Sequence, residues 1–386
     1  MKKMNWYLLE PGLDEEFKDY SIPNFFQTGY PYLTESFYRL WSQIMGIMIE
    51  CLEYEFGTFS ILNDLPAYES IDAIKDFYGQ YYSKMSDSFV KIDNKILLTD
   101  KLPTMVKSLY DRKIKNSYAS YSVVRPNHYA YKNNLREEFI HYFQIVIKTE
   151  YSMDILSEKL YDALNLFFEK INLPSIPAKR STNSFYQCKT CWYSLWRNKK
   201  LYAVMQCGVL KKECYSYEKE TSEFIIDIGG TQRLFFSWIL ANSDGFGLKI
   251  PSSMRNYDAL LITDVDNLDM IYLKEKLNGS GIRVKMSDKL TKLKQSRKAA
   301  YKYGYDYLVV PRKLNENKFF QIYTRDGRNK IFYDVNEIVD FCLNDLSTDF
   351  CLYNKSMEIV KQYIYGDYIY VDDSLGKLEI LKERVF

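Results

Sequence analysis

Apolar residues recur at three- and four-residue spacing in two long stretches of the first half of the chain. In residues 34–55 they predict a helix that ends at Gly57, because glycine is the usual stop residue of a helix. In residues 153–173 they predict a second long helix, which Pro174 terminates. These two helices are expected to pack their apolar sides against a common core.

Strands are expected between the two helices. Residues 59–62 form a short apolar run that leads to Pro66, and residues 120–125 and 135–147 form two longer runs around the polar loop 126–134. Two strands joined by one loop favour an antiparallel pair. The first half therefore predicts long helices with antiparallel strands between them, which is an α+β arrangement.

After Pro251 short apolar strands alternate with helices. Strands are expected at 258–265, 282–286 and 307–310, helices at 270–277 and 289–303, a hairpin from 319–323 and 330–333, and a last helix to 346 with Asp334 as its cap. Strands and helices that alternate at this length imply parallel βαβ units. Beyond it, residues 347–386 stay unassigned except for an expected strand at 363–371.

Composition agrees with two or three soluble domains. The chain has 386 residues, of which 47% are hydrophobic and 26% charged, and its net charge is +2. The 36 Tyr and 23 Phe are spread along the whole chain, which favours aromatic packing over a single stacking surface. No apolar run follows the first residues and none reaches 18 residues, so we expect neither a signal peptide nor a membrane span, and a cytoplasmic protein.

Positive charge is concentrated in one stretch. Residues 289–313 carry eight Lys or Arg against the single acid Asp306. A basic helix can neutralise RNA phosphates, and it is also typical of a solvated helix surface. The candidate RNA-binding residues are Lys292, Arg297, Lys298 and Lys302.

Four of the seven cysteines lie close together. Cys188-x-x-Cys191 is followed by Cys207 and Cys214, and a two-residue gap lets two thiolates reach one ion. The spacing therefore predicts a structural Zn²⁺ site in residues 188–214. Buried reduced cysteines are the alternative, because free cysteine is among the most buried residue types.

The segment Ile226-Asp227-Ile228-Gly229-Gly230-Thr231-Gln232-Arg233 leads from an apolar strand into a predicted helix, 234–241. Alone, it is also typical of a turn before a helix with a surface arginine. Together with Leu248-Lys249-Ile250-Pro251 and the strand after Tyr257, it resembles the last catalytic motif of class II aminoacyl-tRNA synthetases, most of all prolyl-tRNA synthetase. The resemblance implies that Gly230 lies under ATP and that Arg233 binds its γ-phosphate.

Residues 120–147 resemble the second motif of the same family. Arg125 ends the first strand, and Glu138-Phe139 stand where the family has Arg-Glu-Phe. The resemblance implies that Arg125 binds the α-phosphate, that Phe139 stacks on adenine and that Glu138 belongs to the ATP site. Alone, Arg125 also fits a solvated strand end and Phe139 a core aromatic.

Two positions depart from the family pattern. Asn127 stands where the family has a glutamate, and Thr99-Asp100-Lys101 stands where prolyl-type enzymes have a Thr-x-Glu that fixes the substrate amine. Because the charge of Lys101 repels an ammonium group, another acid would have to hold that group. The candidates for this role are Asp100, Glu137 and Glu223.

The resemblance implies a domain order. We expect a class II synthetase catalytic domain in residues 1–250, an α/β anticodon-binding-type domain in 251–346 and an extension in 347–386. The helix 34–55 and the strand after it correspond to the family's dimer interface, so a homodimer is expected.

The resemblance also implies an activity, namely ATP-dependent activation of an amino acid as its adenylate, with transfer to tRNA or to a carrier protein. Arg125 and Arg233 would be catalytic, and Glu223 or Asp227 would hold Mg²⁺. The alternative is a synthetase-like subunit without catalysis that binds protein or RNA, which Asn127 and Lys101 favour.

Overall fold

A computed structural model of the chain describes most of its secondary structure. The described residues are 21–22, 32–33, 35–63, 65–66, 68–85, 90–97, 101–124, 139–179, 185–195, 200–215, 222–242, 249–251, 254–262, 268–287, 304–314, 317–325, 327–346, 357–358, 370–371 and 379–380. They fall into two compact units. Unit 1 comprises residues 1–168, 174–237 and 360–386, and unit 2 comprises 169–173 and 238–359.

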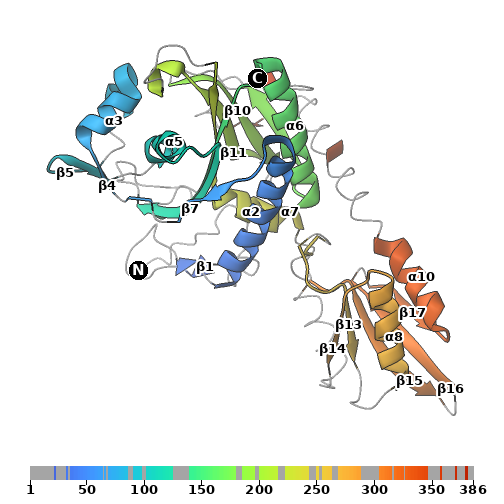
Figure 1. Cartoon of the computed structure of the whole chain (residues 1–386). Coiled ribbons are helices and arrows are strands. Elements are labelled where there is room, and N and C mark those ends of the chain that lie inside the picture. The colour runs from blue at the N-terminus through green and yellow to red at the C-terminus, as the bar shows by residue number, and fades with distance from the viewer. Residues whose placement is uncertain are drawn as a thin grey trace. The chain divides into compact units, whose positions relative to one another are not determined.

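Unit 1 is built on a nine-stranded sheet (Figure 1). Its strand order is β19-β9-β10-β11-β12-β8-β7-β3, and β18 also pairs with β11. All neighbours are antiparallel except β3 with β7 and β18 with β11. The strands are β3 (Ser60–Ile61), β7 (Asn116–Val124), β8 (Phe139–Thr149), β9 (Ser175–Lys179), β10 (Tyr186–Leu195), β11 (Lys200–Leu210), β12 (Phe224–Thr231), β18 (Tyr370–Val371) and β19 (Glu379–Ile380).

Helices α2 (Glu35–Phe56), α6 (Met153–Lys170) and α7 (Arg233–Asn242) carry the apolar periodicity that the sequence predicts. Side chains of α2 and α7 meet on one face of the sheet, where the rings of Phe37 and Phe235 lie 4.6 Å apart. Trp41 of α2 donates from Nε1 to Ser120 Oγ of β7 at 2.9 Å, and Phe168 of α6 stacks with Trp192 of β10. We call this the back face.

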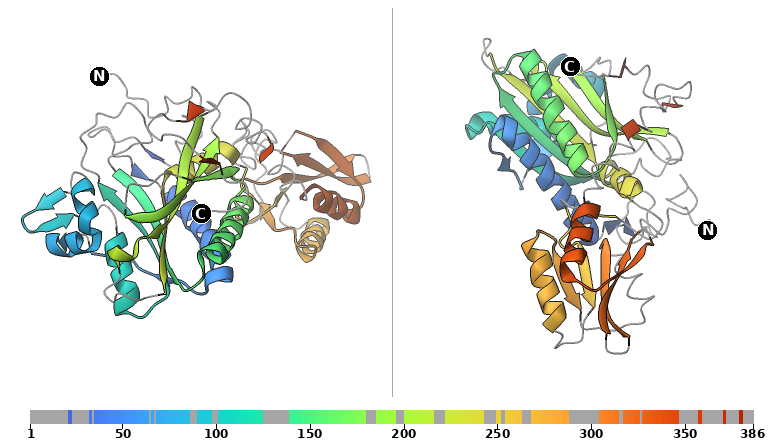
Figure 2. Two further views of the ribbon diagram at one scale, coloured as in Figure 1. Left: turned by 90° about the horizontal axis from the view of Figure 1, so that it is seen from above. Right: turned by 90° about the vertical axis from the view of Figure 1, so that its right-hand side faces the viewer.

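A segment without a predicted counterpart covers part of the opposite face, the front face. It contains β4 (Tyr68–Ser70), α3 (Ile71–Tyr78), the short helices η1 (Gly79–Tyr81) and α4 (Tyr82–Met85), β5 (Val90–Ile92), β6 (Lys95–Leu97) and α5 (Leu102–Asp111). Strands β4, β6 and β5 form a small antiparallel sheet. Apolar residues of α3 and α5 pack with Ala119, Val146 and Leu210 of the large sheet. The left view of Figure 2 shows this segment in light blue and teal.

One side-chain amide links the chain before this segment to the chain after it. Asn116, at the start of β7, donates from Nδ2 to the carbonyl oxygens of Phe56, Gly57 and Thr58, at 2.8, 3.3 and 3.3 Å. Leu62 donates its backbone N–H to Tyr118 O at 2.8 Å. Since the last carbonyls of a helix have no partner within the helix, the amide caps α2 and ties its end to β7.

Unit 2 holds a five-stranded sheet of order β14-β13-β15-β16-β17. Strand β13 (Ala259–Ile262) is parallel to β14 (Val284–Ser287) and to β15 (Tyr307–Leu314), which confirms the expected βαβ arrangement. The hairpin strands β16 (Asn317–Thr324) and β17 (Asn329–Phe332) follow antiparallel. Helices α8 (Leu268–Gly279) and α10 (Val335–Leu346) share one apolar cluster with the sheet. The expected helix 289–303 lies outside the described residues.

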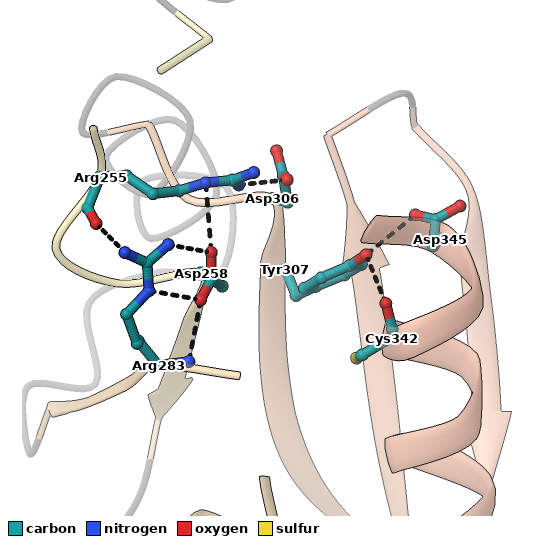
Figure 3. Close-up of polar contacts among 7 residues, drawn as sticks. All are labelled: Arg255, Asp258, Arg283, Asp306, Tyr307, Cys342 and Asp345. Carbon is teal, nitrogen blue, oxygen red and sulfur yellow. Dashed lines mark hydrogen bonds and ion pairs between the residues drawn. The ribbon is translucent and has the colours of Figure 1, made fainter. Parts of the chain in front are cut away.

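A network of ion pairs holds the start of the unit 2 sheet (Figure 3). Asp258 precedes β13 and pairs with Arg255 (3.2 Å) and Arg283 (2.9 Å). Arg255 also pairs with Asp306, which precedes β15. The Arg255 and Asp258 side chains are each 2% exposed, so both charges depend on their partners rather than on water.

Candidate functional site

The register of three strands brings residues from separate parts of the chain together on the front face. Gly229 of β12 pairs directly with Gln144 of β8 and with Gln206 of β11. Asp227 lies two residues before Gly229 on the same face, and its partner on β11 is Gly208. Directly opposite residues of an antiparallel pair share a face, so Gln144, Gln206, Asp227 and Gly229 form one patch.

The two glycines of β12 have different surroundings. A Cβ on Gly230 would lie 2.7 Å from Val204 O and 2.6 Å from a ring carbon of Phe143 on the back face, so Gly230 is required by packing. A Cβ on Gly229 would meet only Phe143 O, at 3.4 Å, among the described residues. The bare backbone on the front face therefore belongs to Gly229, and the contact of Gly230 with ATP that the resemblance implies stays a prediction.

A chain of hydrogen bonds crosses the front face. Tyr121 of β7 donates to Gln144 Oε1 at 2.7 Å, and Gln144 donates from Nε2 to Asp227 Oδ1 at 3.0 Å. Tyr186 of β10 donates to the other carboxylate oxygen, Asp227 Oδ2. Its ring fits because Gly208 has no side chain: a Cβ there would lie 2.5 Å from the ring. Asp227, only 1% exposed, is thus held in one orientation by neutral donors.

Lys101 lies at the Tyr121 end of this series of hydrogen bonds. Its backbone N–H donates to Tyr121 Oη at 3.2 Å, and its ammonium group donates to Pro66 O at 2.6 Å and lies 5.9 Å from the Tyr121 ring centre. The residue is 6% exposed. The lysine that the sequence marks as a departure is therefore buried beside the candidate site and hydrogen-bonded there.

Arg233 is the first residue of α7, directly after β12. Its backbone N–H donates to Thr231 Oγ1 at 3.2 Å, and its Nη1 donates to Ala203 O at 3.3 Å. Gln232 anchors this helix start because its amide oxygen accepts the N–H of His141 and its own N–H donates to His141 O. The guanidinium group and the positive end of the helix dipole together favour an anion at this point.

The two alternative candidates for holding Mg²⁺, Glu223 and Asp227, have different surroundings. Asp227 is buried and engaged by Gln144 and Tyr186, while Glu223 pairs with Lys148 at 3.3 Å. They are four residues apart on extended chain, about 13 Å at the rise of a strand. No group of three or more His, Cys, Asp or Glu among the described residues could hold a metal ion. Each acid therefore has its own protein partners, and Glu223 or Asp227 as the residue that would hold Mg²⁺ stays a prediction.

The zinc prediction finds no support, and the reason is the strand geometry. Cys188 and Cys191 both lie within β10, three residues apart, so their side chains point to opposite faces of the sheet. Cys207 pairs with Thr190, which lies two residues from Cys188 on β10, so Cys207 and Cys188 both face the back. Cys214 belongs to the front-face cluster. Four sulfurs divided between two faces cannot surround one ion.

Burial affects the ionisation of three of these thiols. It raises the pKa of Cys188 and of Cys214 to about 11 and moves the pKa of Cys207 well above its usual range. In the metal-free chain these three groups therefore carry their protons near neutral pH. The alternative of buried reduced cysteines agrees with the structure.

Several predicted site residues lie outside the described residues. These are Arg125, Asn127, Glu138, Lys292, Arg297, Lys298 and Lys302, and Phe139 is described only as the first residue of β8. Sequence reasoning missed Gln144, Tyr186 and Gln206, which join the site from three strands. The one local signal was Gly208, whose missing side chain admits the Tyr186 ring.

The large antiparallel-rich sheet of unit 1, with helices on its back face, fits the fold of a class II aminoacyl-tRNA synthetase catalytic domain. The chain is similar in structure to the Giardia lamblia prolyl-tRNA synthetase in complex with prolyl-adenylate. The TM-score is 0.68 at 10% sequence identity, and the match covers 87% of this chain and 78% of that chain. At this identity the likeness extends to the fold alone. No family model matches the sequence, and no curated protein matches it.

None of the described helices has the length and apolar character that crossing a membrane requires.

Proposed function

We propose that this protein binds ATP and activates a carboxylate substrate, an amino acid, as its adenylate. The observation that carries the proposal is the run from the bare Gly229 on β12 to Arg233 at the head of α7, within a synthetase-like sheet. In such a reaction a carboxylate oxygen attacks the α-phosphorus of ATP, the bond from that phosphorus to the oxygen bridging to the β-phosphorus breaks, and pyrophosphate leaves.

In this proposal the protein contributes positioning and positive charge. Arg233 binds the terminal phosphate, and Arg125 would neutralise the charge that develops on the α-phosphoryl group. Glu138, Phe139 and the backbone at Gly229 and Gly230 would hold the nucleotide. Gln144 and Gln206 are the strand partners of Gly229 on the front face, so their side chains would flank a ligand over that backbone.

We expect Arg233→Ala and Arg125→Ala each to weaken ATP binding about tenfold or more. Each variant removes a charge-assisted contact, which contributes about 1.5–3 kcal/mol. Isothermal titration calorimetry with ATP measures the effect. Arg112→Ala is the matched control, because Arg112 is exposed at the end of α5, and its ATP affinity should equal that of the wild type. Equal affinity in the wild type and both site variants would remove the ATP site from the proposal.

A synthetase-like subunit without catalysis is the second candidate, and the buried Lys101 favours it. An ammonium group beside the front face opposes the amine of an ordinary amino acid. ATP–pyrophosphate exchange with each of the twenty amino acids, without added RNA, separates the two candidates. Exchange with any one amino acid supports the enzyme, whereas ATP binding with no exchange for all twenty supports the non-catalytic subunit.

The acceptor proposed is tRNA, which the basic stretch around Lys292, Arg297, Lys298 and Lys302 would contact. Reversing these four residues to Glu should weaken tRNA binding and flatten its salt dependence, because each neutralised phosphate adds about 0.7–0.9 to the log–log slope. Filter binding over a salt series measures both effects, and ATP affinity serves as the control. A wild-type chain without salt-dependent tRNA affinity would exclude tRNA and leave a carrier protein or small molecule as acceptor.

A further inference from the structure

Two serine hydroxyls flank the ring of His141 on the back face. Ser120 Oγ lies 3.0 Å from Nε2, and Ser122 Oγ lies 2.8 Å from Nδ1. Both serines belong to β7, and His141 lies directly opposite Ser122 on β8. The proposed ATP chemistry uses none of these three groups.

Aromatic side chains of α2 fix the orientation of the imidazole ring. The ring centres of Phe37, Tyr38 and Trp41 lie 5.6, 5.2 and 5.2 Å from that of His141, each in an edge-to-face arrangement. The histidine is 6% exposed. The imidazole therefore has one well-defined position, with Nδ1 directed at Ser122.

The hydrogen bonds of Ser120 determine which ring nitrogen carries the proton. Ser120 Oγ accepts from Trp41 Nε1 at 2.9 Å and donates its single proton to Tyr142 O at 3.2 Å. With the hydroxyl proton on Tyr142 O, the contact with His141 is one in which Nε2–H donates. A neutral imidazole has one N–H, so Nδ1 is left as an acceptor, and Ser122 Oγ–H donates to it.

We propose that Ser122 is a nucleophilic serine that takes an acyl group from an activated acyl compound, an ester or a mixed carboxylic–phosphoric anhydride, with His141 as its base. Ser120 is the positioning residue, because it holds Nε2 protonated. Ser122 itself is exposed, so a reagent in solution reaches Oγ. A nucleophile bonded to a base that a third group orients is the arrangement that activates a hydroxyl. The proposal is independent of the ATP site.

In the acylation step Ser122 Oγ attacks the acyl carbon while its proton moves to His141 Nδ1. The bond from that carbon to the leaving oxygen breaks, and the leaving group departs with the electron pair and takes the proton from Nδ1. Burial lowers the pKa of His141 to about 4, so the ring is neutral and able to accept a proton at pH 7. The same burial disfavours the imidazolium form, so strongly activated compounds should react and simple esters only slowly.

A fluorophosphonate probe with the full-length protein and no nucleotide tests this proposal. Ser122 Oγ would displace fluoride from phosphorus, and peptide mass spectrometry would locate the label. We expect labelling at Ser122 at least about tenfold faster than at Ser152, which is also exposed, and a similar loss of rate in His141→Gln. Equal rates at Ser122 and Ser152, or an unchanged rate in His141→Gln, would overturn the proposal.

Three further variants separate reactivity from folding. Ser122→Ala should abolish the label while the protein stays folded, with a small loss of thermal stability because His141 Nδ1 loses its donor. Ser152→Ala should leave labelling unchanged. The role of Ser120 has its own readout, the ¹⁵N chemical shifts of the His141 ring. We expect protonated Nε2 in the wild type and a mixture of tautomers in Ser120→Ala. A wild-type ring protonated at Nδ1 would contradict the proposed direction of proton transfer, whether or not the label is found.

Discussion

Replacing Gly230 with alanine is expected to destabilise unit 1 by about 2–3 kcal/mol, the range of an overpacked core. The new Cβ would lie 2.7 Å from Val204 O, a backbone atom of the neighbouring strand, and 2.6 and 3.0 Å from two carbons of the Phe143 ring. Neither side can yield easily, because Val204 is held in β11 and Phe143 is fully buried against the back-face helices. Denaturant unfolding followed by tryptophan fluorescence measures the loss.

Gly229→Ala is the matched control for this prediction. Its Cβ would make only an ordinary contact with Phe143 O at 3.4 Å, so the free energy of unfolding should change by no more than about 0.5 kcal/mol. Equal destabilisation by the two substitutions would show that the difference between the two faces of β12 is not the cause.

Asp258→Ala is expected to destabilise unit 2 by about 3 kcal/mol, the lower end of the usual cost of breaking a buried ion pair, because Arg255 keeps Asp306 as a partner. The substitution removes both carboxylate oxygens that Arg255 and Arg283 contact, and the Arg255 side chain is 2% exposed (Figure 3). It also removes the acceptor of the Arg283 backbone N–H, at 2.8 Å. Hydrogen–deuterium exchange of the β13 and β15 amides reports the loss for unit 2 separately.

An exposed ion pair of the same unit supplies the comparison. Lys318 and Asp269 lie 2.8 Å apart, but their side chains are 71% and 46% exposed. Water screens such a pair, so Asp269→Ala should cost about 0.5 kcal/mol or less. If both aspartate variants exchange at the same rate, burial of the Arg255–Asp258 pair does not contribute as argued.

The sequence predicted those elements whose apolar pattern lies within the element itself or its immediate neighbours. Helix α2 carries its buried stripe at helical spacing, and the alternation of β13, α8 and β14 is complete within 30 residues. The segment between β3 and β7 gave no such signal, because its helices and strands are short and gain their apolar contacts from the large sheet. The strand in the cysteine-rich region was missed for a related reason. Part of Tyr186–Leu195 is buried on both faces, so its sequence shows no alternation of apolar and polar residues.

The candidate site shows the same limit at the level of single residues. Arg233 was predicted because it follows a glycine pair and begins a helix, which are neighbours in sequence. Gln144, Asp227 and Tyr186 form one contact set although they are separated by 41 to 83 positions, and only strand register joins them. Gly229 and Gly230 also differ because they present opposite faces of β12. A register shift of one residue would exchange the two faces, so the sequence alone could not show which glycine faces the front.

The cap that Asn116 places on the end of α2 has a consequence for how this fold can diverge. Residues 56–58 and residue 116 are adjacent in space, and Leu62 pairs with Tyr118 immediately beside them. The chain therefore leaves the sheet after β3 and returns to it at the start of β7, close to the Asn116 contact. The strand order β12-β8-β7-β3 does not involve the residues between β3 and β7. Loop-closure entropy grows only slowly with length. We expect proteins that share an ancestor with this chain to differ most in the length of the segment between β3 and β7. We expect them to retain an amide or an equivalent donor at the position of Asn116.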